Sequence, residues 1–208
     1  MNPRTRNGLI VIGIALALLA FFVFITEPEG VTFTSEKNAP TVQDEDPHIG
    51  TEDAEITLVF FGDAVSEASG EVAGLLNRLL ENETNIQVIF KDYPNNSLNE
   101  ESLAAAIAAR CAHAQDAFWE YHLALTEQRE VLGEEVYTSI AESLDLKENS
   151  FKKCREDLDI ASYIADTIQE GQDLAVAGAP TLFLGSQRIS GSLSMNDLEV
   201  WINSTVSE

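Results

Sequence analysis

The stretch ITLVFFGDAVSEASG, residues 56–70, decides the fold of this 208-residue chain. Its first six residues form a continuous apolar run, which is typical of a strand buried on both faces of a sheet. A second such run, IQVIF, spans residues 86–90, and leucines between the two runs recur at helical spacing. A strand, a helix and a strand in this order predict a β-α-β unit with two parallel strands.

The sequence from about residue 98 to residue 174 predicts a block of helices. Four segments within it have helical periodicity or composition: residues 103–117, 118–127, 136–144 and 160–174. After this block, residues 181–189 predict a β-hairpin. Ser194, with Asp197 three positions later, is typical of the N-terminus of a final helix.

Six short motifs follow one another along the chain. They are DPHIG with DA (46–50, 53–54), FKDYP (90–94), ARCA with FWEYH (109–112, 118–122), FKKC (151–154), VAGAPT (176–181) and ISG (189–191). The order of elements together with these motifs resembles the DsbA-like thioredoxin-fold family of thiol:disulfide oxidoreductases, including its membrane-anchored members. The resemblance covers about residues 46–206, and it implies an α/β, thioredoxin-like fold with a helical domain inserted at about residues 98–174.

Ser66 and Ser69 occupy the positions at which the family carries the thiols of its Cys-x-x-Cys motif, so Ser66-Glu67-Ala68-Ser69 replaces that motif. In the family, the first thiol lies at a helix N-terminus, which lowers its pKa and produces the attacking thiolate. A hydroxyl forms no disulfide and does not ionise there, so thiol–disulfide exchange has no nucleophile at this site. We therefore expect both serines to cap the helix and expect no catalytic residue here.

Serine-hydrolase chemistry is an alternative use of Ser66, but it requires a general base and an oxyanion hole. The neighbouring Glu67 indicates neither a general base nor an oxyanion hole. The chain has three histidines, His48, His113 and His122, and the last two belong to the predicted helical block. We expect structural roles for those two.

Both cysteines of the chain, Cys111 and Cys154, lie in the helical block. In an exported domain an even number of cysteines favours pairing, so we expect a structural disulfide. Two free buried thiols and a catalytic dithiol are the alternatives. Because two thiols fall short of the four ligands of a structural zinc site, we expect no metal and no cofactor.

Pro180 matches the cis-proline of the family, which faces the active-site dithiol and leaves the backbone before it free to bind a peptide strand. The resemblance therefore implies a peptide groove formed by Ser66, Ser69, Ala179, Pro180 and Thr181. In such a groove an extended polypeptide pairs with the backbone of Ala179 as an added strand. This mode of binding does not require a thiol.

Residues 8–26 are uncharged and mostly apolar, and a helix of this length covers about 28 Å, close to the hydrocarbon thickness of a bilayer. A cleavable signal peptide is the alternative, but its apolar region is usually shorter, about 7 to 15 residues. We expect one transmembrane helix in the cell membrane, with residues 1–7 cytoplasmic because two arginines precede the helix and glutamates follow it. Residues 27–46 are expected to form a linker to an extracytoplasmic domain, residues 47–206.

Beyond the apolar segment the chain has 10 basic and 35 acidic residues, a net charge of −25. Such a charge repels phosphate backbones, so nucleic acid is a poor candidate partner. It is typical of a solvated acidic surface, and a cationic partner is the alternative.

The sequence favours a membrane-tethered, extracytoplasmic domain that lacks redox activity and binds exported polypeptides or a membrane or envelope protein, as a chaperone-like or scaffold module. The alternative is a thiol:disulfide oxidoreductase or isomerase, acting on exported proteins, that uses Cys111 and Cys154. A third hypothesis is a purely structural domain whose groove is filled by its own side chains or by a permanent partner.

Overall fold

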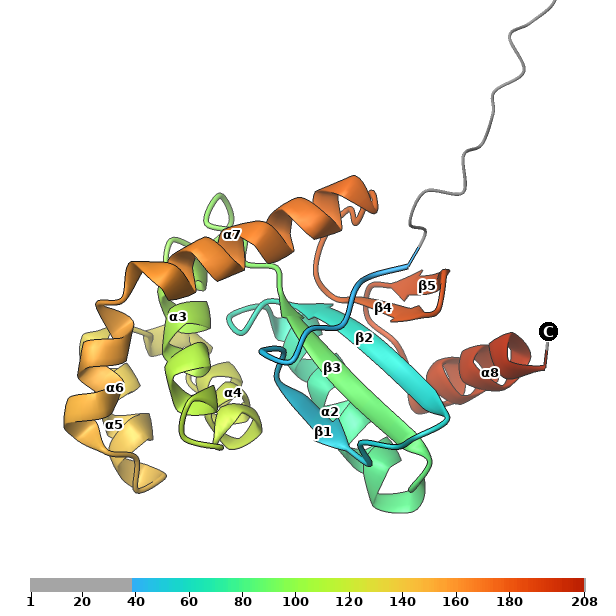
Figure 1. The fold of residues 1–208 in the computed structure, drawn as a ribbon, viewed down its shortest axis with the longest axis horizontal. Helices are drawn as coiled ribbons and strands as arrows, with labels where there is room; N and C mark the ends of the chain where they lie inside the picture. The colour runs from blue at the N-terminus through green and yellow to red at the C-terminus, as the bar shows by residue number, and fades with distance from the viewer. Residues whose placement is uncertain (1–38, 208) are drawn as a thin grey trace, which may run out of the picture. The chain divides into compact units, whose positions relative to one another are not determined.

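A computed structural model describes residues 39–207, in which helices surround a five-stranded sheet (Figure 1). The central strands are β2 (Ile56–Gly62) and β3 (Ile86–Asp92), which run parallel. They are joined by α2 (Glu67–Asn82), whose apolar residues face the sheet. The β-α-β unit predicted from residues 56–90 is therefore confirmed.

The remaining strands extend this pair in the order β1-β3-β2-β4-β5. The short β1 (His48–Gly50) pairs antiparallel with β3, while β4 (Thr181–Leu184) pairs antiparallel with both β2 and β5 (Gln187–Ser190). The register between β2 and β4 sets Phe61 beside Thr181. The loop that follows β2 and the loop that precedes β4 consequently lie at the same end of the sheet.

The helical insertion lies between β3 and β4. In Figure 1 the helices α3 to α6 gather at one end of the sheet, and α7 returns from them toward it. The helices after α2 are α3 (Ser102–His113), α4 (Phe118–Glu127), the 3-10 turn η1 (Arg129–Val131), α5 (Glu134–Ser143), α6 (Glu148–Arg155), α7 (Leu158–Asp173) and α8 (Met195–Val206). The insertion therefore spans the predicted region, with α6 as an additional helix.

Alternate residues of the central strands face two separate apolar clusters, as expected for strands buried on both faces. On one face Phe60 packs with Leu76 of α2 and Leu198 of α8 in the larger cluster. On the other face Phe61 and Phe183 join a smaller cluster with Val176, just after α7. The sheet is thus covered on both sides, which leaves its ends for a binding site.

The predicted transmembrane helix, residues 8–26, lies outside the described residues. Within residues 39–207 no helix is both long enough and apolar enough to cross a bilayer.

Candidate functional site

Asp63, the residue that follows β2, organises the site because its buried carboxylate connects three chain segments. Oδ1 accepts a hydrogen bond from the backbone N–H of Val65 (3.1 Å), which closes the turn before α2. Oδ2 accepts from the N–H of Asn95 in the loop after β3 (3.1 Å) and from the Ser102 hydroxyl of α3 (3.0 Å). Burial raises the pKa of the Asp63 carboxyl, and these hydrogen bonds oppose part of that rise.

Ser66 and Ser69 both use their hydroxyls to satisfy backbone N–H groups at the start of α2. Ser66 is the N-cap, and its Oγ accepts from the N–H of Ser69 (3.3 Å). The Oγ of Ser69 accepts from the N–H of Asp63 (3.2 Å), and Ser69 is fully buried. Of the two serines, only Ser66 is accessible to solvent, and it is half-buried.

The opposite wall of the site is the loop before β4, in which the Ala179–Pro180 peptide bond is cis. Thr181 is buried and its hydroxyl donates to the carbonyl of Gly178 (2.8 Å), which holds the loop against the strand. Among the hydrogen bonds within residues 39–207, none involves the backbone of Ala179. Its N–H and C=O are therefore available to an added strand.

A hollow of about 340 Å³ separates these two loops. Ser66 and Ala179 border it, whereas Ser69, Pro180 and Thr181 are buried behind its surface. Its lining consists of Asp63, Ser66, Tyr93, Pro94, Asn95, Leu98, Ile168, Gln172, Ala177, Gly178 and Ala179. Of the five residues predicted to form the groove, two therefore line this hollow, and the other three are buried and do not line it.

Leu98 and the α7 residues Ile168 and Gln172 belong to the site but were not predicted from the sequence. The available signal for Leu98 was a single apolar residue within the polar stretch NNSLNEE, residues 95–101, and in the structure its side chain is 86% exposed. The α7 residues carry no comparable signal, because only the packing of α7 brings them to the hollow.

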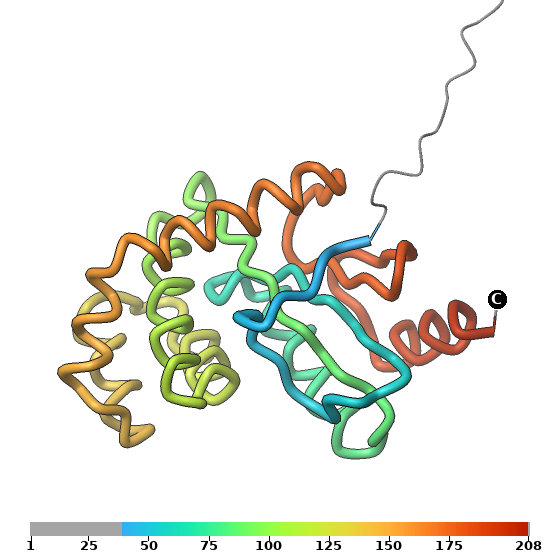
Figure 2. Tube along the Cα trace, in the orientation of Figure 1, coloured from blue at the N-terminus to red at the C-terminus, as the bar shows by residue number. Residues whose placement is uncertain are grey.

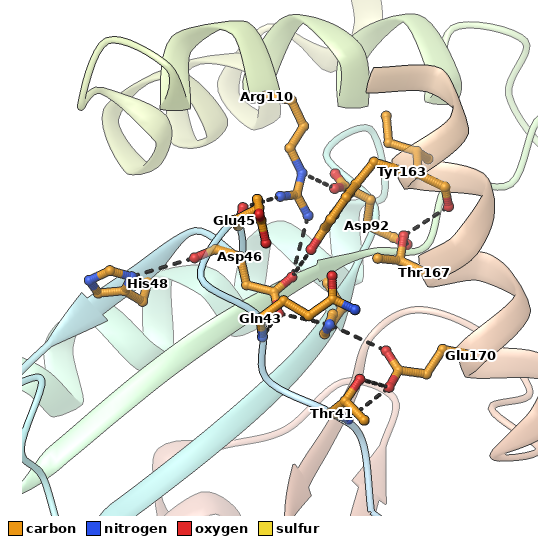
Figure 3. Close-up of polar contacts among 12 residues, drawn as sticks. Thr41, Gln43, Glu45, Asp46, His48, Asp92, Arg110, Tyr163, Thr167 and Glu170 are labelled. Carbon is orange, nitrogen blue, oxygen red and sulfur yellow. Dashed lines mark hydrogen bonds and ion pairs between the residues drawn. The ribbon is translucent and has the colours of Figure 1, made fainter. Parts of the chain in front are cut away.

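A buried ionic cluster fixes α7 in this position (Figure 3). Nζ of Lys91 lies 2.8 Å from the Asp46 carboxylate and 3.3 Å from Glu170 of α7, with Lys91 and Asp46 both buried. Arg110 of α3 pairs with Asp92 and lies 3.8 Å from Asp46. Each buried carboxylate of the cluster thus has a cationic partner, which offsets part of the cost of removing its charge from water.

The same cluster holds the chain segment that leads into β1, drawn in blue beneath α7 in Figure 2. The N–H of Thr41 donates to Glu170 (2.7 Å), and Nη1 of Arg110 donates to the carbonyl of Glu45 (2.7 Å). Residues 41–46, which the sequence assigned to the linker, are therefore part of the folded domain. Lys91, at the end of an otherwise apolar strand, was the available signal for this cluster.

Cys111 and Cys154 form a disulfide between α3 and α6, with Cα atoms 5.6 Å apart. Cys111 is fully buried. Both cysteines lie inside helices, away from the helix N-terminus that would activate a thiol, and neither borders the hollow.

No histidine lines the hollow, so the described residues supply no imidazole base for Ser66. His122 is fully buried, stacks on Phe118, and has no hydrogen-bond partner at either ring nitrogen within the described residues. Burial lowers the pKa of His122 to about 4. Nor do residues 39–207 bring together three or more His, Cys, Asp or Glu side chains in a metal-binding arrangement.

Comparison with known proteins identifies the family. The sequence profile described as Thioredoxin matches residues 42–204. The chain belongs to the thioredoxin family. Two Na(+)/H(+) antiporters contain a similar segment: NhaA 1 of Salinispora arenicola, 32% identical over 167 residues, and NhaA 3 of Salinispora tropica, 27% over 165. Each alignment covers 79% of this chain and 25% of the antiporter, so the chain spans about a quarter of these relatives' length.

Solved structures share the fold of this thioredoxin-family chain. The thiol-disulfide exchange protein α-DsbA2 of Wolbachia pipientis has a TM-score of 0.70 and 23% identity, over 77% of this chain and 87% of that one. The catalytic domain of Proteus mirabilis ScsC has a TM-score of 0.70 and 21% identity, over 80% and 92%. The thioredoxin-like fold with a helical insertion and the resemblance to DsbA-like proteins are thus confirmed.

Proposed function

We propose that the chain is a membrane-tethered, extracytoplasmic thioredoxin-fold protein that lacks redox activity and binds polypeptides, as a chaperone-like or scaffold module. The hollow between Ser66 and Ala179 is the observation that carries this proposal. It brings the backbone of Ala179, which is unpaired within residues 39–207 and lies in the loop before β4, close to the start of α2, where hydroxyls occupy the two positions at which an oxidoreductase needs thiols.

Binding without exchange chemistry follows from the roles of the two hydroxyls. Both accept backbone hydrogen bonds at the start of α2, so they contribute to the geometry of the loop rather than to a reaction. The backbone of Ala179 keeps its hydrogen-bonding capacity whether or not a sulfur lies opposite. A polypeptide can therefore be held here without forming a mixed disulfide.

The membrane tether and a membrane partner belong to the same proposal. The apolar residues 8–26 support an anchor, and the related segment within two proteins named as antiporters supports an association between such domains and membrane proteins. We propose exported polypeptides or a membrane or envelope protein as the partner, with the domain outside the cell membrane.

Insulin reduction and dithiol-peptide oxidation by the purified full chain in detergent test the absence of redox activity. We expect rates equal to the blank, and no thiol available to alkylation before a reductant is added. A rate above the blank that Cys111→Ala abolishes would show that the alternative, an oxidoreductase using Cys111 and Cys154, is correct. The burial of Cys111 in α3 argues against that alternative.

The double substitution Ser66→Cys and Ser69→Cys tests whether the frame of an oxidoreductase persists. The first position is the N-cap of α2, where the helix dipole and free N–H groups stabilise a thiolate. We expect the double variant to gain dithiol oxidase or reductase activity, with Ser66→Ala/Ser69→Cys inactive as its control. A folded but inactive double variant would mean that the loop geometry has diverged from that of the oxidoreductases.

A further inference from the structure

Three aspartates of the domain are almost entirely buried, and one of them has no cation beside it. Asp46 is paired with Lys91 and Asp92 with Arg110. Asp63 is 6% exposed, yet no Lys, Arg or His nitrogen of residues 39–207 lies within 4.0 Å of its carboxylate. Its hydrogen-bond donors are two backbone N–H groups and the hydroxyl of Ser102, all neutral.

Neutral donors stabilise a carboxylate, but they leave its net charge in place, and buried charges are usually paired. Asp63 differs from the other two aspartates in a second respect, because it borders the hollow of about 340 Å³ beside Ser66. That volume accommodates a long side chain that reaches in from a bound polypeptide. A polypeptide bound in the hollow can therefore supply the cationic partner that Asp63 lacks.

The remainder of the lining fits the side chain of a lysine or arginine. None of the residues that border the hollow is basic, so nothing there repels an ammonium or a guanidinium. Pro94, Leu98 and Ile168 offer apolar surface to the hydrocarbon stem of such a side chain, and Asp63 belongs to the same lining.

Two sources of positive charge near the hollow oppose the binding of a cation there, and acidic side chains offset both of them. The first is the N-terminus of α2, whose dipole is weakened by Glu67 in the first turn. The second is Arg129, which lies 3.2 Å from Glu67 and 3.5 Å from Glu130 and is therefore already paired. The net charge of −25 beyond residue 26 adds a field that attracts cations toward the domain.

We infer that the polypeptide bound in this hollow carries a lysine or arginine side chain that pairs with Asp63, so the site selects basic extended segments. This inference rests on the proposed function, because it names the class of polypeptide that the same site takes. It assigns to Asp63 a role in specificity beyond its role in closing the turn before α2.

The test uses three fluorescein-labelled peptides of sequence Ser-Val-X-Val-Ser, in which X is Lys, Gln or Glu, and fluorescence anisotropy with the full chain in detergent at low salt. We expect the Lys peptide to bind roughly tenfold more tightly than the Gln peptide and the Glu peptide to bind weakest. Asp63→Asn should reduce the Lys preference to about twofold or less. Glu199→Gln, which removes one exposed charge outside the hollow, should preserve it.

The outcomes separate this inference from the function on which it rests. Equal affinity of the wild-type chain for all three peptides, with binding lost in Ser66→Trp, would overturn the selection of basic segments and leave polypeptide binding intact. If none of the three peptides binds, both polypeptide binding and the selection of basic segments are contradicted. The wild-type comparison decides the matter even if Asp63→Asn fails to fold, and a Lys preference that survives in a folded Asp63→Asn would contradict the role of Asp63.

Discussion

Ser69 illustrates how a single oxygen supports the site without taking part in chemistry. Its hydroxyl is fully buried and is the acceptor for the N–H of Asp63. Asp63 in turn accepts hydrogen bonds from Asn95 and Ser102, so the loops after β2 and β3 depend on one another. A serine is therefore well suited to this position for structural reasons.

Replacing this hydroxyl should destabilise the fold. Ser69→Ala leaves the buried N–H of Asp63 without an acceptor, which costs about 1 to 3 kcal/mol. Urea unfolding followed by circular dichroism measures the loss. Ser192→Ala, at an exposed position, is the control and should change the free energy of unfolding by less than about 0.5 kcal/mol. A Ser69→Ala variant as stable as the wild type would show that this hydrogen bond is dispensable.

His122 should make the fold sensitive to acid. Its pKa of about 4 in the folded state lies below the ordinary 6.5, so the unfolded chain binds the extra proton as the pH falls between these values. The resulting loss of stability between pH 6.5 and pH 4 reaches about 3 kcal/mol. His122→Leu should show a smaller loss over that range, with His48→Gln, at an exposed position, as the control substitution. Parallel stability profiles for His122→Leu and wild type would contradict this assignment.

At the scale of helices and strands, the disulfide is the covalent connection between α3 and α6. The helix α6 has eight residues and a single buried one, Phe151, so packing alone holds it weakly. The cross-link compensates by restricting the unfolded chain, since it closes a loop with a sequence separation of 43.

Removal of this bond should lower stability without affecting polypeptide binding. The double variant Cys111→Ala/Cys154→Ala should lose up to about 4 kcal/mol of unfolding free energy, the chain-entropy value for a loop of this length. Equilibrium unfolding with and without reductant provides the measurement, because reduced wild type should resemble the variant. An unchanged unfolding midpoint in both would mean that the bond contributes nothing.

Elements with strong periodicity could be predicted from the sequence, and weak ones could not. The apolar runs at residues 56–61 and 86–90 became β2 and β3 because both of their faces are buried. The strand β1 has three residues, and α6 has too few apolar positions to show a period. Ser66 and Ala179 of the hollow were predicted, whereas Ile168 and Gln172 could not be, because only the packing of α7 brings them to it.

At the scale of the whole molecule, acidic charge dominates. Beyond residue 26 the chain carries 35 acidic and 10 basic residues, and several of the basic ones are buried or already paired. The sequence predicted this imbalance but not that Lys91 and Arg110 would be used inside the fold. Such self-repulsion is a cost that dissolved salt can reduce.

Stability should therefore rise with ionic strength. Raising NaCl from about 0.05 M to 1 M shortens the Debye length from roughly 14 Å to 3 Å, which screens repulsion between exposed carboxylates. The thermal midpoint of the full chain should increase. A triple Glu→Gln variant at the exposed positions 71, 81 and 199 should be more stable than wild type at low salt and equal to it at 1 M. A midpoint independent of salt in both proteins would contradict a repulsive surface.

Photocrosslinking from position 66 tests most directly whether the site at the start of α2 holds polypeptides. A benzoylphenylalanine in place of Ser66 faces the hollow, and the same group in place of Glu199 serves as a control outside it. After irradiation of cells that express the full chain, mass spectrometry identifies the adducts. We expect polypeptides crosslinked to position 66 and not to position 199. No adduct at position 66, or the same adducts from both positions, would contradict polypeptide binding at this site.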